Sequence, residues 1–312
     1  MSARTAQRAL GSVGARGRLV LAVTSMIGLA GFAWPLLYGA RRAGPDSAHA
    51  ADAPWLFAVL VALLLVIVAV EHAAGRLTAK TVAVLAVLAA LNSVLRLPGG
   101  VAGFNALWFL LIVSARAYGP TFGFLLGSFT LACSALVTGG VGPWLPFQML
   151  AAGWVGLGVG LLEPVPRGGR AEVLALAAYG IAAAVVYDLV MDLWFWPLAV
   201  EGPLGFEPGI GLGATIGRFV AFHLATALPW DLTGAVGNAA VLLTVGGPAL
   251  HTLERAGRRL RFQAVPELVE LDQPATPCAS PAAPGDVTRE APEEDELDRG
   301  GKPSDRRRGA RS

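Results

Sequence analysis

Long apolar stretches dominate this chain and decide what it can fold into. A helix needs about 20 mostly apolar residues to cross a bilayer. Eight segments qualify or come close: 18–40, 54–72, 79–95, 104–117, 120–138, 145–162, 171–196 and 214–249. We therefore predict an all-α polytopic membrane protein with about eight transmembrane helices, seven and nine being the alternatives. Segment 104–117 is short enough to be tilted or partly re-entrant, and Pro229 should kink or divide 214–249.

Charged residues are scarce and unevenly placed. They make up 15% of the chain, against about 25% in a soluble domain, and half of them follow residue 250. Segment 261–312 is rich in Pro, Ala and charge, which predicts a disordered cytoplasmic tail. Cys133 lies in an apolar segment and Cys278 in this tail, so we expect neither a disulfide nor a metal site.

Basic residues predict the orientation, because cytoplasmic loops of membrane proteins are enriched in Lys and Arg. With both termini cytoplasmic, the inner side carries Arg4, Arg8, Arg16, Arg18, Arg76, Lys80, Arg116, Arg167, Arg170, Arg255, Arg258, Arg259 and Arg261. Arg41 and Arg42 are exceptions on the outer side. The basic start predicts a cytoplasmic flank, not a cleaved signal peptide. Three Gly/Pro-rich loops, 96–105, 138–148 and 201–213, then face outward, where they could surround a cavity.

Small residues predict how two of the helices pack. Gly119, Gly123 and Gly127 recur every four residues, as do Ala152, Gly156 and Gly160 in the next apolar segment. Such rows let helix backbones approach closely in a membrane. We expect segments 120–138 and 145–162 to form a close pair around the loop TGGVGPWLPFQ.

Polar and aromatic residues within the apolar segments are candidates for function, because they are costly to keep there. The candidate substrate-binding residues are Asn92, Arg96, Asn105, Trp144, Phe147, Gln148, Asp188, Asp192 and Trp194. Each has a structural alternative. The tryptophans could belong to an interfacial belt, Arg96 could extend to the lipid headgroups, and Asp188 could pair with Arg218 or Arg96. A lone His223 is more typical of a packing residue than of a ligand.

Motifs of the common enzyme classes do not occur in the sequence. Lys80 and Lys302 are the two lysines, and neither follows the glycine of a Walker phosphate loop. The sequence has no zinc-ligand spacing and no Gly-x-Ser-x-Gly elbow. It also lacks the folded basic face that nucleic-acid binding requires. These observations predict a protein that is not an enzyme and needs no cofactor of its own.

Four stretches make the chain resemble a known family. They are ALNSVLRLPGG (90–100), LIVSARAYGPTFGFLLGSFT (111–130), TGGVGPWLPFQMLAAGWVGLGVGLL (138–162) and YDLVMDLWFWP (187–197). Segment 79–260 resembles the substrate-specific (S) component of energy-coupling factor (ECF) transporters, in its actinobacterial form. The resemblance implies a six-helix S-component-like core at 76–260, preceded at 1–75 by a basic flank and two extra helices and followed by the tail at 261–312.

The resemblance also implies a function. An S component captures a vitamin or related micronutrient from outside, with cobalamin or another corrinoid favoured here, and resides in the plasma membrane. Its partners are a transmembrane coupling subunit and two ABC ATPases, which use the ATP. Alanines on the first core helix face the coupling subunit in that family, and the matching residues are Ala79, Ala83, Ala86 and Ala90. The alternatives are a non-transporting membrane scaffold and a stand-alone secondary transporter.

Overall fold

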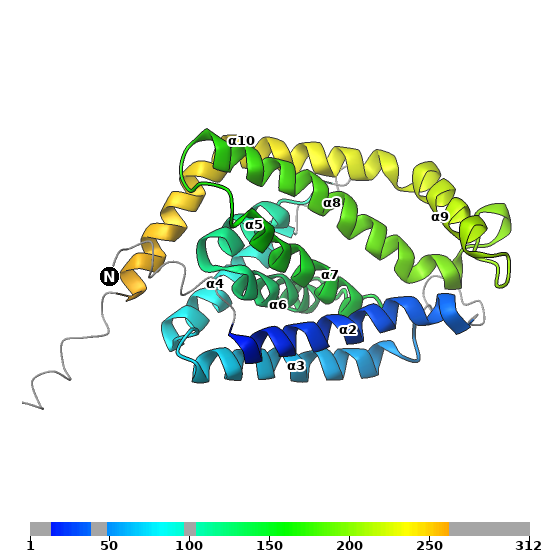
Figure 1. The fold of residues 1–312 in the computed structure, drawn as a ribbon, viewed down its shortest axis with the longest axis horizontal. Helices are drawn as coiled ribbons and strands as arrows, with labels where there is room; N and C mark the ends of the chain where they lie inside the picture. Colours follow the sequence, from blue (N-terminus) through cyan, green and yellow to red (C-terminus); the bar gives the residue numbers. More distant parts are fainter. Residues whose placement is uncertain (1–13, 39–48, 97–103, 262–312) are drawn as a thin grey trace, which may run out of the picture. The chain divides into compact units, whose positions relative to one another are not determined.

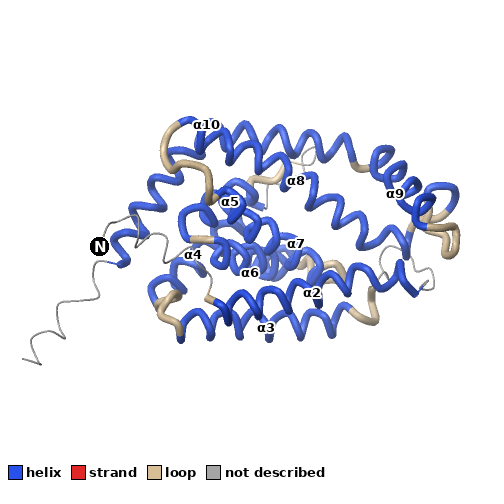
Figure 2. The backbone as a smooth tube through the Cα atoms, in the orientation of Figure 1, coloured by secondary structure: helices blue, strands red, loops and turns tan. Residues whose placement is uncertain are grey.

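The structure is a computed structural model that describes residues 14–38, 49–96 and 104–261 (Figure 1). Helices form all the regular secondary structure of these residues (Figure 2). The predictions for Arg4 and Arg8, for Arg41 and Arg42, for most of the loop 96–105 and for the tail concern parts of the chain outside this description.

The long helices follow the predicted apolar segments closely. They are α2 (Ala15–Tyr38), α3 (Ala53–Ala73), α4 (Ala79–Arg96), α5 (Leu107–Tyr118), α6 (Pro120–Thr138), α7 (Leu145–Gly158), α8 (Arg170–Ala199), α9 (Leu212–Thr226) and α10 (Leu228–Arg261). Two short 3-10 helices, η3 (Val159–Leu162) and η4 (Gly202–Leu204), follow α7 and α8.

Seven helical segments in the described residues are long and apolar enough to cross a membrane: α2, α3, α4, α6, α7 with η3, α8 and α10. The protein is therefore a membrane-embedded, multi-pass α-helical protein. The predicted count of eight included 104–117, but α5 has only 12 residues. At 1.5 Å per residue it is about 18 Å long, which is too short to cross the roughly 30 Å hydrocarbon layer.

The last predicted segment, 214–249, is divided into two helices, as Pro229 indicated. Helix α9 ends at Thr226, α10 begins at Leu228, and Pro229 lies in the first turn of α10. Proline is tolerated there because the first amide groups of a helix have no partner within the helix. The predicted end at residue 249 was too early. Helix α10 continues to Arg261, past the internal Pro248.

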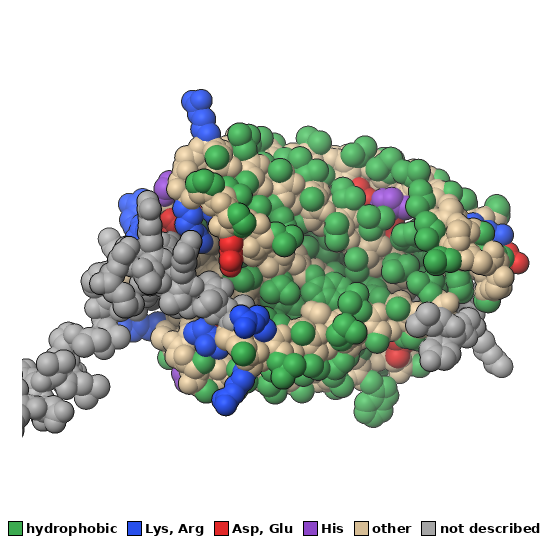
Figure 3. Space-filling view, viewed as in Figure 1, with side chains coloured by type: hydrophobic (Ala, Val, Ile, Leu, Met, Phe, Trp, Pro, Cys, Tyr) green, Lys and Arg blue, Asp and Glu red, His purple; other side chains and the backbone are tan. Residues whose placement is uncertain are grey.

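Basic side chains gather at one end of the helices, which we call the basic end (Figure 3). A buried ion pair fixes this end: Arg116 Nε lies 2.7 Å from Glu172 Oε1, and Arg116 also donates to the carbonyl oxygens of Leu162 and Val165. Arg116 was predicted to lie in an inner loop, but it is in the last turn of α5 and is 3% exposed. Burial is possible because Glu172 and two carbonyl groups compensate the charge.

Aromatic and small residues occupy the opposite end, which we call the aromatic end. Helices α2, α4, α6 and α8 finish there, and α3 and α7 begin there. Contacts across helices establish this arrangement. The Arg96 guanidinium, at the end of α4, reaches Ser134 near the end of α6 and Gln148 in the first turn of α7.

Helices α6 and α7 form the closest pair in the fold, as their small residues predicted. A methyl group built at Gly123 would lie 2.5 Å from the backbone oxygen of Gly156, and one at Gly127 would overlap the backbone oxygen of Ala152. Ser128 adds a 3.0 Å hydrogen bond to the Met149 carbonyl oxygen. The two backbones are thus in direct contact.

The first two helices pack on this pair. Gly28 of α2 lies against Leu150 of α7, and Trp154 of α7 donates a 3.0 Å hydrogen bond to Ser25 of α2. Helix α3 packs alongside α2 and also contacts α7 (Figure 1). The N-terminal helices α2 and α3 therefore pack against α7, the helix that follows the loop 138–148.

The glycine contact predicts a position-specific loss of stability. Replacing Gly127 with Ala should force α6 and α7 apart, at a cost of about 1–3 kcal/mol for an overpacked site, and should lower the Tm of detergent-solubilised protein. Gly217→Ala in α9 is the matched control, because a methyl group there meets no atom within 4 Å. Equal Tm values for both variants would show that the α6–α7 contact does not stabilise the fold.

Candidate functional site

An aromatic cluster lies between α2, α3, α7 and α8 at the aromatic end. It consists of Phe32, His49, Trp144, Phe147 and Trp194. The Phe147 ring centre lies 4.8 Å from Phe32, 4.5 Å from His49 and 6.2 Å from Trp194, and Trp144 meets Trp194 edge-on at 6.5 Å. Phe147 is completely buried. These flat surfaces are suited to packing against an apolar or heteroaromatic group.

His49 connects this cluster to polar groups. Its Nδ1 lies 2.7 Å from Asp52 Oδ2 and its Nε2 lies 2.9 Å from the Trp194 carbonyl oxygen. Both neighbours are acceptors, so His49 donates to both only when each ring nitrogen carries a proton. The backbone of His49 is in the left-handed region, with φ of 56°. This conformation raises the free energy of the folded state for a residue other than glycine. Sequence reasoning missed His49. Asp52 before an apolar run is a helix-start signal, but no such signal marks a histidine three residues earlier.

A polar ladder joins α4 to α6. Asn92 Nδ2 donates to Thr130 Oγ1 at 3.2 Å, and one turn later Arg96 Nη1 donates to Ser134 Oγ at 3.1 Å. Arg96 Nη2 lies 3.4 Å from Gln148 Oε1 on α7. Because Ser134 is completely buried, the Arg96 guanidinium points into the bundle, so it does not extend outward to the headgroups.

Three aspartates and a histidine form an acid–histidine cluster at the break between α9 and α10. His223 Nδ1 lies 2.7 Å from Asp192 Oδ2, and its Nε2 lies 3.2 Å from Asp231 Oδ2. The Asp231 carboxyl lies beside that of Asp188. The cluster therefore brings three carboxyl groups and one imidazole together between α8, α9 and α10.

These contacts correct one expectation for Asp188. Arg218 does not pair with it, because Arg218 Nη1 lies 2.9 Å from Glu207 Oε2 in the preceding turn segment. Arg96 bonds to Ser134 and Gln148 instead. His223 has partners on both ring nitrogens, as expected of a satisfied histidine, but those partners are carboxylates.

The predicted site residues fall into three neighbouring groups. Trp144, Phe147 and Trp194 belong to the aromatic cluster, Asn92 and Arg96 with Gln148 to the polar ladder, and Asp188 and Asp192 to the acid–histidine cluster. Asn105 stands apart: its Oδ1 accepts a 3.2 Å hydrogen bond from the Leu107 amide at the start of α5, which is the contact of an Asx-turn before the helix.

In the aromatic cluster and the polar ladder, two buried polar atoms have no hydrogen-bond partner in the described part of the chain. They are the Asn92 carbonyl oxygen and the Trp194 indole nitrogen. Such atoms are uncommon, because leaving a buried donor or acceptor unpaired costs about 1–3 kcal/mol. Among the residues described, no three His, Cys, Asp or Glu side chains come together in a way that could hold a metal ion.

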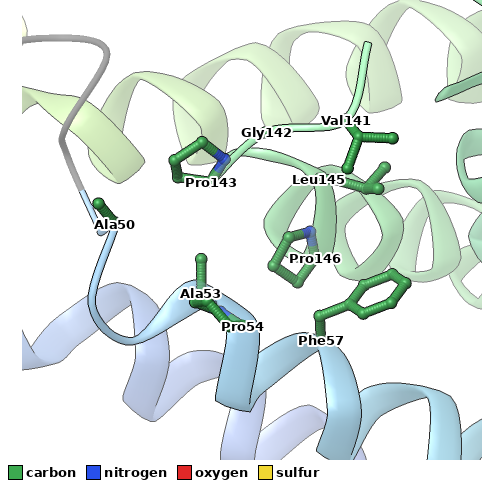
Figure 4. Close-up of a pocket in the computed structure, with 9 residues that line it drawn as sticks. All are labelled: Ala50, Ala53, Pro54, Phe57, Val141, Gly142, Pro143, Leu145 and Pro146. Carbon is green, nitrogen blue, oxygen red and sulfur yellow. The ribbon is translucent and has the colours of Figure 1, made fainter. Parts of the chain in front are cut away.

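An apolar pocket of about 340 Å³ lies beside the aromatic cluster (Figure 4). Nine residues line it: Ala50, Ala53, Pro54, Phe57, Val141, Gly142, Pro143, Leu145 and Pro146. The loop before α7 therefore does shape a concave surface toward the start of α3. Trp144, Phe147 and Gln148 are not part of this lining, since they face the aromatic cluster and the polar ladder.

Comparisons with known proteins yielded no match to a family model, to a curated protein or to a solved structure.

The Asp52 carboxylate gives a prediction for pH dependence. Burial alone would raise its pKa, but hydrogen bonds from His49 and Trp34 outweigh this effect and lower the pKa below 3.8. A lowered folded-state pKa stabilises the fold above the unfolded value, and that contribution is lost as the pH falls through the folded value. We expect the Tm difference between wild type and Asp52→Asn to be constant from pH 7 to about 5 and to shrink below about pH 4. A difference that stays constant down to pH 2.5 would contradict the stabilising role of this carboxylate.

Proposed function

We propose that this protein is the substrate-binding subunit of an ECF-type importer. It captures a vitamin or related micronutrient, with a corrinoid such as cobalamin favoured, and delivers it through a coupling module. One observation carries the proposal: at the end of the bundle opposite the basic residues, Arg96 of α4 bonds to Gln148 of α7, and the preceding residue Phe147 packs against Trp194 of α8. Together they offer charge, amide hydrogen bonding and flat apolar surface.

The orientation follows from the positive-inside rule. The basic end would face the cytoplasm, because Lys and Arg are retained on that side. The aromatic end would then face outward, in the plasma membrane of the cell. A site at that end is where a capture protein would meet a solute from the medium.

The exposed face of α4 supports the coupling role. Ala79, Ala83, Ala86 and Ala90 are all exposed in the described structure. Small side chains on an exposed membrane helix allow another helix to approach closely. We assign this face to the transmembrane coupling subunit, whose two ATPases would hydrolyse the ATP. In this proposal the chain has no catalytic residue and no cofactor of its own.

A second candidate function is favoured by the acid–histidine cluster. Carboxylates and histidines inside membrane helices are typical of proton pathways in transporters, and His223 lies between the carboxyl groups of Asp192 and Asp231. A stand-alone proton-coupled transporter would use this cluster and need no ATPases. Uptake by the protein alone in proteoliposomes with an imposed proton gradient, abolished by His223→Ala, would favour this candidate. The remaining alternative, a membrane scaffold, would bind no solute at all.

The binding site is tested with the purified full chain in nanodiscs. Small molecules that co-purify are identified by mass spectrometry, and cobalamin and a vitamin panel are titrated by calorimetry. The proposal expects submicromolar binding by the wild type. It expects at least tenfold weaker binding, about 1.4 kcal/mol, after Trp144→Ala with Gln148→Ala.

Trp55→Ala is the matched control for this variant. Trp55 is 77% exposed on α3 and lies outside the three groups of candidate residues, so its loss should leave the Kd unchanged. Unchanged affinity in the Trp144/Gln148 variant would exclude this site. A folded wild type that binds no member of the panel would contradict the capture role.

The coupling face is tested separately from binding. Ala83→Leu with Ala86→Leu would thicken the exposed face of α4 and should abolish ATP-dependent uptake in cells that contain the coupling module, while solute binding by the purified protein stays intact. Ala182→Leu, at an exposed position of α8, is the control and should leave uptake normal. Normal uptake by the α4 variant would remove this face from the proposed interface.

A further inference from the structure

Arg96 differs from the other shielded arginines of the described structure. Arg76 lies 2.6 Å from Glu71, Arg116 lies 2.7 Å from Glu172, and Arg218 lies 2.9 Å from Glu207. Each of these three guanidinium groups therefore has a carboxylate partner. Arg96 is half-buried like Arg76 and Arg218, yet its hydrogen bonds go to the neutral oxygens of Ser134 and Gln148.

Acidic residues of the described structure do not supply the missing negative charge. The Asp188 carboxyl lies beside that of Asp231, while the Arg96 guanidinium bonds to Ser134 and Gln148. Asp192 is bound to His223. The sequence that follows Arg96, residues 97–103, contains no Asp or Glu.

A shielded guanidinium without a counter-charge is costly, because arginine cannot release its proton. Its two observed hydrogen bonds also leave part of its five-donor fork free. Planar, bidentate recognition of carboxylate and phosphate is the interaction to which this fork is best suited. Among the described residues, Arg96 therefore has the donor set of an anion site and no carboxylate bound to it.

A second observation points to a ligand at the same place. Asn92 lies one helical turn before Arg96 on the same face of α4 and is completely buried. Its amide nitrogen is bonded to Thr130, but its carbonyl oxygen has no partner in the described residues. This oxygen is an acceptor that an N–H or O–H group next to an anion could satisfy.

We propose that Arg96 is an anion subsite that binds a carboxylate or phosphate group of the captured solute, with the Asn92 carbonyl oxygen accepting a hydrogen bond from a neighbouring donor on that solute. This inference rests on the proposed function and narrows its substrate to negatively charged molecules. The phosphate of a lipid headgroup has the same chemistry. The inward direction of the guanidinium, toward the buried Ser134, favours the solute.

The test uses the full chain in nanodiscs and probes that differ by one anionic group. The pairs are biotin and biotin amide, nicotinate and nicotinamide, and cobinamide phosphate and cobinamide. We expect the wild type to prefer the anionic member of one pair by about tenfold or more, the effect of a charge-assisted hydrogen bond. Arg96→Gln should reduce that preference to about twofold or less, and its Tm should stay above the temperature at which binding is measured. Arg96→Lys should retain part of the preference.

Arg218→Gln is the matched control, because it removes an equally shielded arginine that already has a carboxylate partner. It should keep the preference of the wild type. Native mass spectrometry of both proteins in phosphatidylglycerol nanodiscs distinguishes the lipid source. A phosphatidylglycerol molecule retained by the wild type and lost in Arg96→Gln would keep the anion subsite but overturn the solute as its occupant.

Two other outcomes overturn the proposal. In the first, the wild type binds a probe, and Arg96→Gln binds each member of that probe pair with the same affinity as the wild type. Arg96 is then not an anion subsite, while the capture function stands. If the wild type binds neither an anionic probe nor a lipid in an Arg96-dependent way, the anion subsite is wrong. Binding of the neutral probes alone would then still support capture, and binding of no probe would contradict capture as well.

Discussion

The backbone contact between α6 and α7 is the interaction on which the rest of the structure depends. Glycine at positions 123, 127 and 156 lets the two helices touch without intervening side chains. Apolar lipid provides no hydrophobic force between helices, so close packing of this kind is a principal source of association in a membrane. The pair fixes the loop between the helices, and with it the start of α7 where Phe147 and Gln148 lie.

The two ends of the bundle differ in how the charge of a shielded arginine is compensated. At the basic end, Arg116 is buried and fully paired with Glu172 and carbonyl groups, an arrangement that holds α5, η3 and α8 in place. At the aromatic end, Arg96 has no carboxylate partner among the described residues. Buried polar atoms without hydrogen bonds occur at both ends of the described structure, in Asn92 and Trp194 at the aromatic end and in Thr121 at the basic end. Complete pairing is typical of structural roles, whereas incomplete pairing is where a ligand gains the most from binding.

The sequence predicted those parts of the fold that depend on local pattern. Hydropathy placed the apolar helices, the spacing of glycines predicted the α6–α7 pair, and Pro229 predicted the division before α10. Segment 104–117 was counted among the candidate spans and was also expected to be tilted or partly re-entrant. Its apolar composition reflects burial among other helices, and composition alone does not distinguish burial in protein from exposure to lipid. The length of α5 settles the difference.

Long-range pairings of the candidate site could not be predicted in the same way. The sequence showed that Arg96 and Asp188 were unusual, but their partners depend on how α4, α6, α8 and α10 cross. His49 reaches the Trp194 carbonyl oxygen across 145 residues of chain, and no local pattern encodes that contact. The carboxyl pair of Asp188 and Asp231 likewise appears only when α8 and α10 are side by side.

The most direct test of solute capture is an electron cryo-microscopy structure of the natively extracted protein in nanodiscs, with an antibody fragment bound for alignment. The account predicts non-protein density at the aromatic end, in contact with the Arg96 guanidinium and bordered by Trp194 and Gln148. Density for a solute confined to the acid–histidine cluster, or a well-ordered aromatic end with no bound molecule after incubation with the vitamin panel, would contradict it.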